Sequence, residues 1–564
     1  MKRISSAVRT SNVIVLIIFL ILGILIVCPL FLVVLHSFLD KPLMEPGNFF
    51  TFKNYTKLFT SRSFQEGVLN TFSTAVISTL IAALWGVIMG WLIARTDVPL
   101  KKYFEIAIMI PIFIPPMILS IAWTALASDK VGVLNRFIFS ISHTGRPLLN
   151  IYSREGVIWV MALQYTTYFF IFVSSSLRSM DPALEEASAI SGAHFFRTLR
   201  SVTFPLTLPA ILSSIILIFT QAWGLFTVPY ILGSPKGYKY ISTEIYNKMN
   251  VFPPDVGYAV AISSLLLVII LIAVPIQNYI LRGRKFITVT GRGYRPQIIP
   301  LGQWKYAGFA ICLAYVLLAF VLPFGMLFLW SIMKVLGGAI TWTNLTLANY
   351  REALKDTVSQ LSIRNTLIVA LVGATAGTIL SLIIEYLIHR KKIFGEKVLT
   401  QLTMLPLSIP SLILGLGFLW LWLIFPINLY GSLWVLPISF IAAFIPFGVR
   451  AFDFSFRQID QSLEEASEIH GASEATTIRK ILLPLLKPGF ISGWILLFIS
   501  MMRELGVIIF IYKAKSIVLT AAIFELWVAG SYNTMMALTM VQVGLILVSL
   551  AVVIRVFGFE VLRT

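Results

Sequence analysis

Hydrophobic residues along the chain are gathered into long runs that short polar stretches separate. A transmembrane helix needs about 20 consecutive, mainly apolar residues, and twelve runs are long enough. These runs lie near residues 12–36, 68–94, 104–127, 156–177, 207–230, 257–281, 306–331, 365–388, 398–424, 432–449, 488–511 and 535–554. The pattern predicts an all-α polytopic membrane protein with about twelve transmembrane helices.

The first run could also be a secretory signal peptide, because Lys2, Arg3 and Arg9 precede it. Its apolar stretch is longer than the hydrophobic region of a signal peptide, and no small-residue cleavage site follows. We therefore expect a retained first span.

Composition agrees with a membrane protein. Of 564 residues, 58% are hydrophobic and 12% are charged, whereas a soluble globular protein carries about 25% charged residues. Cys28 and Cys312 both fall inside apolar runs, where cysteine behaves as a small hydrophobic residue. Neither a disulfide framework nor a cysteine metal site is expected.

The net charge of +19 would suggest nucleic acid binding in a soluble protein. In a membrane protein the position of the basic residues matters more, since loops rich in Lys and Arg stay in the cytoplasm. The stretch 282–297 contains five basic residues and no acidic one. We interpret it as a cytoplasmic anchor rather than a site for lipid headgroups or nucleic acid, and we expect both termini in the cytoplasm.

A repeat organises the chain. Residues 181–209 align with 460–488 without a gap and are identical at 14 of 29 positions, at an offset of 279. Upstream the offset is 295, as in the pairing of Asn70-Thr71 with Asn365-Thr366. The chain therefore consists of two homologous halves in tandem.

The change of offset means that the first half carries 16 extra residues between Pro115 and Asp181. The connection 129–156 is the place where we expect them, on the external side. We expect a first half at 1–281, a basic cytoplasmic linker at 282–305 and a second half at 306–564. With six spans each, the halves should be parallel repeats.

The repeated segment is predicted to form a helix, a turn and a second helix. Asp181 and Asp460 suit a helix N-cap, and Pro182 suits the first helical position. Gly192 and Gly471 stand where the short helix should end. From the residues alone, the segment could be an ordinary interfacial connection between spans or a docking element for a twofold partner.

The sequences EEASAISG (185–192) and EEASEIHG (464–471), each followed by a proline at 205 or 484, resemble the EAA loop of binding-protein-dependent ABC importer permeases. The resemblance covers nearly the whole chain and implies the type I importer permease fold. It also implies that each loop forms a coupling helix that docks on an ATPase subunit. The implied coupling residues are Glu185, Glu186, Ala187, Ser188, Gly192, Glu464, Glu465, Ala466, Ser467 and Gly471.

The chain contains no G-x-x-x-x-G-K-[ST] phosphate-binding sequence. It is therefore expected to have no catalytic residues and to bind no cofactor directly, with ATP and Mg reaching the complex through the partner. The resemblance implies two copies of an ATPase subunit on the cytoplasmic face, an external substrate-binding protein and a bacterial inner membrane location. No nucleic acid partner is expected.

The segments 228–262 and 503–537 resemble fused permeases of the ferric-iron type, and phosphonate and thiamine permeases are similar. Ferric iron is therefore the expected cargo. A secondary transporter driven by protons or sodium is the rival interpretation, since it also has two parallel halves. It would not need a repeated docking loop.

Arg503 and Glu504 continue an apolar run, and charges at membrane depth are costly unless they are paired or face water. They either line the translocation path or lie at the external end of a shorter span. The equivalent residues of the first half are Gly224 and Leu225, so this feature belongs to one half only. The five histidines are scattered without metal-site spacing, and no metal site is expected.

Overall fold

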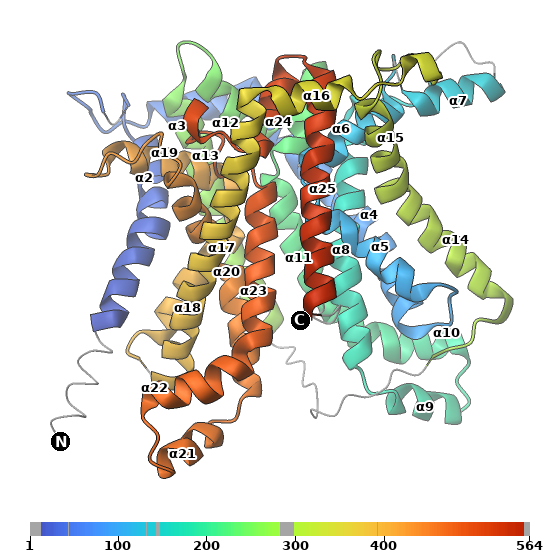
Figure 1. The fold of residues 1–564 in the computed structure, drawn as a ribbon, viewed down its shortest axis with the longest axis vertical. Coiled ribbons are helices and arrows are strands. Elements are labelled where there is room, and N and C mark those ends of the chain that lie inside the picture. Colours follow the sequence, from blue (N-terminus) through green and yellow to red (C-terminus); the bar gives the residue numbers. More distant parts are fainter. Residues whose placement is uncertain are drawn as a thin grey trace. The chain divides into compact units, whose positions relative to one another are not determined.

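The computed structural model describes residues 13–42, 44–130, 132–142, 147–282, 298–391 and 393–557. Within these ranges the regular structure is helical, and β structure is limited to three isolated bridges. Long helices run side by side within each compact part of the chain (Figure 1). The predicted all-α fold is confirmed.

Nine helices in the described residues are long and apolar enough to cross a membrane. Five of them are single α-helices: α4 (Arg62–Arg95), α8 (Arg154–Ser179), α17 (Thr357–Lys391), α20 (Val435–Gln458) and α25 (Tyr532–Phe557), whose apolar part is Tyr532–Val552. The other four are continuous but include π or 3-10 turns: Val13–Ser37, which includes η1 (Gly23–Val27) and α2 (Cys28–Ser37); Leu199–Gly224, made of η2 (Leu199–Thr203) and α11 (Phe204–Gly224); Gly302–Ser331, made of η5 (Gly302–Trp304), α14 (Lys305–Val316), η6 (Leu317–Val321) and α15 (Leu322–Ser331); and Glu474–Arg503, made of α22 (Glu474–Thr477), η9 (Ile478–Leu482) and α23 (Leu483–Arg503). The expected sixth span matches α13 (Val256–Arg282).

Shorter helices connect the long ones. They are α3 (Lys53–Thr60), α7 (Val133–Ser142), α9 (Ala183–Ile190), α10 (Phe195–Thr198), η3 (Pro229–Gly233), η4 (Ser234–Lys236), α12 (Ile241–Asn250), η7 (Trp342–Asn344), α16 (Ala348–Lys355), α21 (Ser462–Ile469), η10 (Ala514–Ser516) and α24 (Leu519–Val528).

The third predicted span of each half is not one straight helix. In the first half α5 (Lys101–Phe113) and α6 (Pro116–Ala127) meet at 105°, and in the second half Glu396–Ser408 meets α19 (Ser411–Ile424) at 111°. Glu396–Ser408 comprises α18 (Glu396–Met404) and η8 (Leu405–Ser408). The runs at 104–127 and 398–424, which were expected as spans, are therefore each formed by a bent pair of helices that is apolar enough for a span over its combined length.

Proline explains both bends. Ile114 and Ile409 have extended backbone conformations, because the residue before a proline is pushed out of the helical region. Pro115 and Pro410 follow them, and the repeat had already paired these two prolines. The bend is thus encoded in both halves.

The fifth span of each half has different ends in the structure from those that the apolar pattern predicted. The helices end at Gly224 and Arg503 rather than near 230 and 511, because Leu225 and Glu504 turn extended. At the other end, Pro205 follows the π-helical turn η2 and the corresponding proline follows η9. The π-turn lies directly before the proline, which has no N–H to donate, and the helix continues past it.

The chain packs into two compact units, one formed by Thr51–Asn349 and the other by the chain up to Phe50 together with the chain from Tyr350 onward. The helix Val13–Ser37 therefore packs with residues of the second half. A Cβ added at Gly417 in α19 would lie 2.7 Å from the Pro29 carbonyl oxygen, so the backbones of these two helices are in close contact at this point.

The helix Gly302–Ser331 packs in the unit of the first half in the corresponding manner. The rings of Phe309 and Phe104 lie 5.2 Å apart, and Gly308 faces Leu92 and Val98 closely. The first helix of each sequence half is thus exchanged between the two packing units.

The extra residues of the first half include α7. The buried Asn135 of this helix donates to the carbonyl oxygens of Ser128 (2.9 Å) and Leu149 (2.7 Å) and accepts from the N–H of Leu149 (2.9 Å). One amide side chain therefore organises the connection that was expected to hold the insertion.

The Asn-Thr pairs found in the repeat have the same role in both halves. Asn70 donates to the Lys239 carbonyl, and Thr71 accepts from the N–H of Ile241, each at 3.0 Å. These contacts hold the start of α12 against α4.

In the second half Asn365 donates to the Ile517 carbonyl at 2.9 Å, and Thr366 accepts from the N–H of Leu519 at 2.8 Å. The second span of each half therefore anchors the segment that follows its fifth span.

Candidate functional site

The two copies of the repeated segment fold in the same way. The Asp181 carboxylate accepts a hydrogen bond from the N–H of Ala183, and the Asp460 carboxylate accepts one from the N–H of Ser462, both at 2.9 Å. The short helices α9 and α21 follow, and each lies at one end of the long helices of its unit (Figure 1). The predicted arrangement of helix, turn and second helix is present in both.

The hydrogen bond between Asp460 and the start of α21 has an electrostatic consequence. The N–H of Ser462 lowers the pKa of the Asp460 carboxyl below its ordinary value. The stabilisation that this hydrogen bond gives to the start of α21 is therefore fully present at pH values above the ordinary pKa of an aspartate. It is lost as the pH falls through the lowered pKa of Asp460.

Both short helices end at glycine. Gly192 and Gly471 each have a φ of +78°, a left-handed conformation that glycine adopts without the cost that a Cβ brings. The N–H of the next residue, Ala193 or Ala472, donates to the carbonyl of Ser188 or Ser467 at 3.1 Å. This geometry turns the chain back toward the following span.

A second contact closes each turn. The hydroxyls of Ser188 and Thr198 lie 2.9 Å apart, and those of Ser467 and Thr477 lie 2.8 Å apart. The serine of the motif is therefore an internal brace between the short helix and the next one.

The two adjacent glutamates of each motif point in different directions. Glu185 is buried and contacts Arg95, with 3.4 Å between Oε2 and the guanidinium, and its Oε1 accepts from Thr203 at 2.6 Å. Glu464 is half-buried and is bonded to Nε of Arg390. These first glutamates are held by their own unit.

The other face of each short helix is exposed. It combines acidic and apolar residues, and its most exposed members are Ile190 at 87% and Ile469 at 84%. The remaining exposed positions of this face are Leu184, Glu186, Ala187, Leu463, Glu465 and Ala466. Each unit thus presents a small outward surface with an apolar tip and an exposed glutamate, Glu186 or Glu465, and α21 exposes Glu468 as well.

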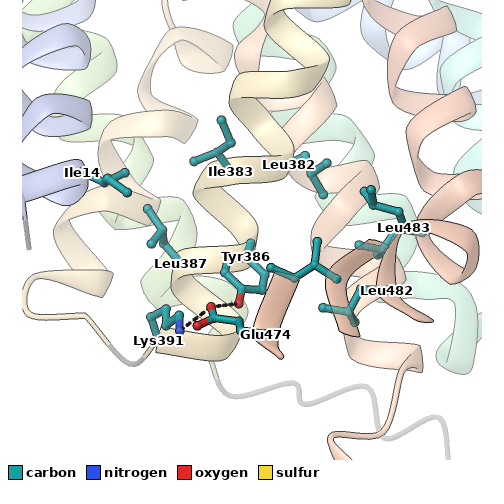
Figure 2. A pocket seen from close by; sticks show the side chains of 11 residues that line it. Ile14, Leu382, Ile383, Tyr386, Leu387, Lys391, Glu474, Leu482 and Leu483 are labelled. Atoms are coloured by element: carbon teal, nitrogen blue, oxygen red, sulfur yellow. Dashed lines mark hydrogen bonds and ion pairs between the residues drawn. The ribbon is translucent and has the colours of Figure 1, made fainter. Parts of the chain in front are cut away.

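The second segment has a further brace, which Figure 2 shows. Glu474 at the start of α22 accepts a hydrogen bond from the Tyr386 hydroxyl at 2.7 Å and pairs with Lys391 at 2.6 Å. These three side chains lie at one end of a largely apolar groove of about 480 Å³. Leucines of α17, η9 and α23 form much of its wall.

The repeat could not have revealed this brace. The positions equivalent to Tyr386, Lys391 and Glu474 are Trp91, Thr96 and Phe195, so only the second half has the charges. A lone glutamate after the motif gave no signal from the sequence alone.

Arg503 and Glu504 lie where α23 ends, and both are half-buried. The Glu504 carboxylate accepts from the N–H of Val507 at 3.2 Å, and its backbone carbonyl accepts from the Thr520 hydroxyl at 2.9 Å. The glutamate therefore caps the turn that follows the span. The assignment of Arg503 and Glu504 to the translocation path stays a prediction.

Three residues that the sequence did not connect lie together in the second unit. Nε2 of His389 is 3.2 Å from the Glu385 carboxylate and 3.0 Å from that of Asp453. These three side chains have the composition of a metal-binding group, but Arg457 pairs with Asp453 at 2.8 Å. The contact between His389 and Asp453 joins α17 to α20, and the expected absence of a metal site stays a prediction.

Comparison with known proteins places the chain in a family. Residues 82–286 and 373–560 match the model of the binding-protein-dependent transport system inner membrane component. The two matches cover most of the chain and fall one in each sequence half.

Individual relatives are also similar. The ferric transport system permease protein FbpB of Actinobacillus pleuropneumoniae is 29% identical over 451 residues, which is 79% of this chain and 64% of that protein. The putative ferric transport system permease protein FbpB 1 of Haemophilus influenzae is 30% identical over 434 residues, or 75% of this chain and 66% of that protein. The chain thus spans just under two thirds of the length of both.

A third relative matches over a longer range. The probable ABC transporter permease protein y4fN of Sinorhizobium fredii is 24% identical over 533 residues, which is 93% of this chain and 92% of that protein.

Proposed function

Since the chain belongs to the family of binding-protein-dependent transport system inner membrane components, we propose that it is the permease subunit of an ATP-driven importer of ferric iron. The observation that carries this proposal is the pair of motif helices. Both have the same aspartate contact at their start, an inward first glutamate and an exposed second glutamate and isoleucine, although they are 279 residues apart in the sequence. A partner with two equal docking sites would explain why the segment occurs twice.

The partner that fits is a pair of ATPase subunits on the cytoplasmic face. Each exposed face offers an isoleucine that can enter an apolar pocket and a glutamate that can pair with a basic residue at its rim. Apolar anchors surrounded by polar groups are typical of protein interfaces. ATP and Mg would be bound by these subunits, and the permease would hold no cofactor.

Transport would follow alternating access. ATP binding would draw the ATPase subunits together, and the motif helices α9 and α21 would carry this movement into the spans of their halves. Substrate would arrive on an external binding protein and pass between the halves. Arg503 and Glu504 are the residues that we propose to contact the path.

Ferric iron is the proposed cargo because two relatives carry ferric transport in their names. Phosphonate and thiamine are the alternatives within the same importer class. Specificity would then depend mainly on the external binding protein.

The experiment is uptake of radiolabelled ferric iron by cells with and without this chain, with phosphonate and thiamine measured in parallel. We expect iron uptake to be lost without the chain and to require ATP. Loss of another substrate instead would replace the cargo and keep the mechanism. Uptake that persists after ATP depletion but stops when the proton or sodium gradient is dissipated would support a secondary transporter.

A further inference from the structure

We propose that Arg95 and Arg390 are positioning residues that lock each motif helix to the second span of its half, so that helix and span move as one lever. The inference rests on the proposed function, because it concerns how movement of an ATPase partner would reach the membrane. It assigns the first glutamate of each motif, Glu185 or Glu464, to the lever rather than to the docking surface.

The arginines are placed where such a lock must be. Arg95 is the last residue of α4, and Arg390 is next to the last residue of α17. These two helices have 34 and 35 residues, which corresponds to about 50 Å at a rise of 1.5 Å per residue. A force applied at this end would therefore act along the whole span.

Burial of the charges makes the contact selective. The Arg95 side chain has 0% of its surface exposed and its partner Glu185 has 7%, whereas Arg390 has 9% and Glu464 has 14%. Taking one charge away from a buried pair leaves the other without compensation. The carboxylate is therefore held at the arginine rather than free to face water.

Each pair has one additional support. In the first half Thr203 donates to Glu185 at 2.6 Å, which ties in the start of the fifth span. In the second half Arg390 also donates to the carbonyl of Ile459 at 3.1 Å, where α20 has just ended. The pair therefore ties the motif helix to the start of the following span in the first half and to the end of the preceding span in the second half.

The repeat argues that the pairs are not accidental. Arg390 is the counterpart of Arg95 at the offset of 295, and Glu464 is the counterpart of Glu185 at the offset of 279. The 16-residue difference between the halves lies between the two partners, yet each pair forms in its own unit. Two independent packings thus reach the same contact.

The adjacent glutamate provides the comparison within the same motif. Glu186 and Glu465 are exposed, so they are available to a partner. We therefore assign docking to the second glutamate and transmission to the first.

The test uses the complete transporter: this chain is purified together with an ABC ATPase of the same organism and is assayed with a ferric-iron-binding protein of that organism. The variants are Arg390→Glu, Glu464→Arg, both changes together, and the conservative Arg390→Lys. Glu465→Gln is the matched variant in the docking surface. Three quantities are measured: copurification of the ATPase, stimulation of ATP hydrolysis by loaded binding protein, and radiolabelled iron uptake.

Each single charge reversal should lower the maximal uptake rate and the stimulated hydrolysis by about tenfold while the ATPase still copurifies. The concentration of binding protein that gives half-maximal stimulation should not change. The double charge swap should recover most of the coupling, and Arg390→Lys should retain part of it. Glu465→Gln should instead weaken copurification of the ATPase.

Normal coupling in both single variants would overturn the inference. So would a double swap that stays as inactive as the single variants although the protein is folded and the ATPase is bound. If the unaltered chain does not copurify with the ATPase at all, the proposed function fails instead, and this outcome is separate from the behaviour of the variants.

Discussion

At the scale of single residues, Gly192 and Gly471 set the geometry of the motif. Both have a φ of +78°, and a Cβ at either position would meet no atom within 4 Å. Space is therefore not the constraint. The constraint is the left-handed backbone conformation, because adopting it costs a residue with a side chain about 1–2 kcal/mol.

We predict that Gly471→Val will nearly abolish uptake while the protein stays in the membrane. The valine would pull the chain out of the left-handed turn and reorient the exposed face of α21. Gly544→Val is the control, since Gly544 is also uncrowded but has no positive φ. Unchanged uptake in Gly471→Val would show that the turn tolerates strain and that the coupling role is misplaced.

Glu504 can be tested without disturbing the fold. In Glu504→Gln the side-chain oxygen that accepts from Val507 is kept and only the charge is removed. If the charge faces the path, the maximal uptake rate should fall about tenfold, equivalent to 1.4 kcal/mol in the barrier. A normal rate would leave Glu504 with its structural role as a cap at the end of α23.

At the scale of elements, the broken third spans show how local chemistry overrides the apolar pattern. Runs 104–127 and 398–424 are continuous in hydrophobicity, yet Pro115 and Pro410 divide them into bent pairs. Backbone polar groups at such a break must be buried in protein rather than exposed to lipid. Ile118 and Ile413, just beyond the breaks, are indeed fully buried.

A prediction at this scale concerns the anchor of α24. Thr366→Val removes the hydroxyl that accepts from the N–H of Leu519 at 2.8 Å, and a buried donor without a partner costs about 1–3 kcal/mol. The melting temperature of the purified protein should fall clearly. Thr378→Val in the same helix is the control.

Thr378 is equally buried, but its hydroxyl only donates to the Ala374 carbonyl within the helix. Its replacement should therefore change the melting temperature much less. Equal shifts in the two variants would mean that burial, and not the bond to α24, sets the cost.

At the scale of the whole molecule, the packing units do not follow the order of the chain. The helix Val13–Ser37 packs with the unit that contains the second half, and the helix Gly302–Ser331 packs with the unit of the first half. Each unit needs a helix from the other half of the sequence for its complete core. Neither half is then expected to be stable as a separate protein.

We predict that fragments 1–290 and 291–564 will accumulate only when they are produced together, and that a tag on one will purify both. Gly417→Leu should reduce this association, because a Cβ there meets the backbone of Pro29. Gly544→Leu is the matched control. A single fragment that is monodisperse and fully helical by itself would contradict the expected exchange of first helices.

The sequence by itself determined the membrane class, the two homologous halves and the family. Hydrophobic length, an internal repeat and a short polar motif can all be read from the order of the residues, without knowledge of which distant residues are in contact. It also located the motif helices and their end glycines, since caps and left-handed turns depend on residues within one or two turns of each other. The cargo is still a proposal at either level.

Only the tertiary structure decided which of two adjacent glutamates faces inward, because Glu185 and Arg95 are 90 residues apart in the chain. It also revealed the brace from Glu474 to Lys391 and the exchange of the first helices. These features depend on contacts between distant segments, and neither periodicity nor propensity encodes such contacts. Burial of a charge beside its partner, rather than the charge itself, is what separates the lever from the docking surface.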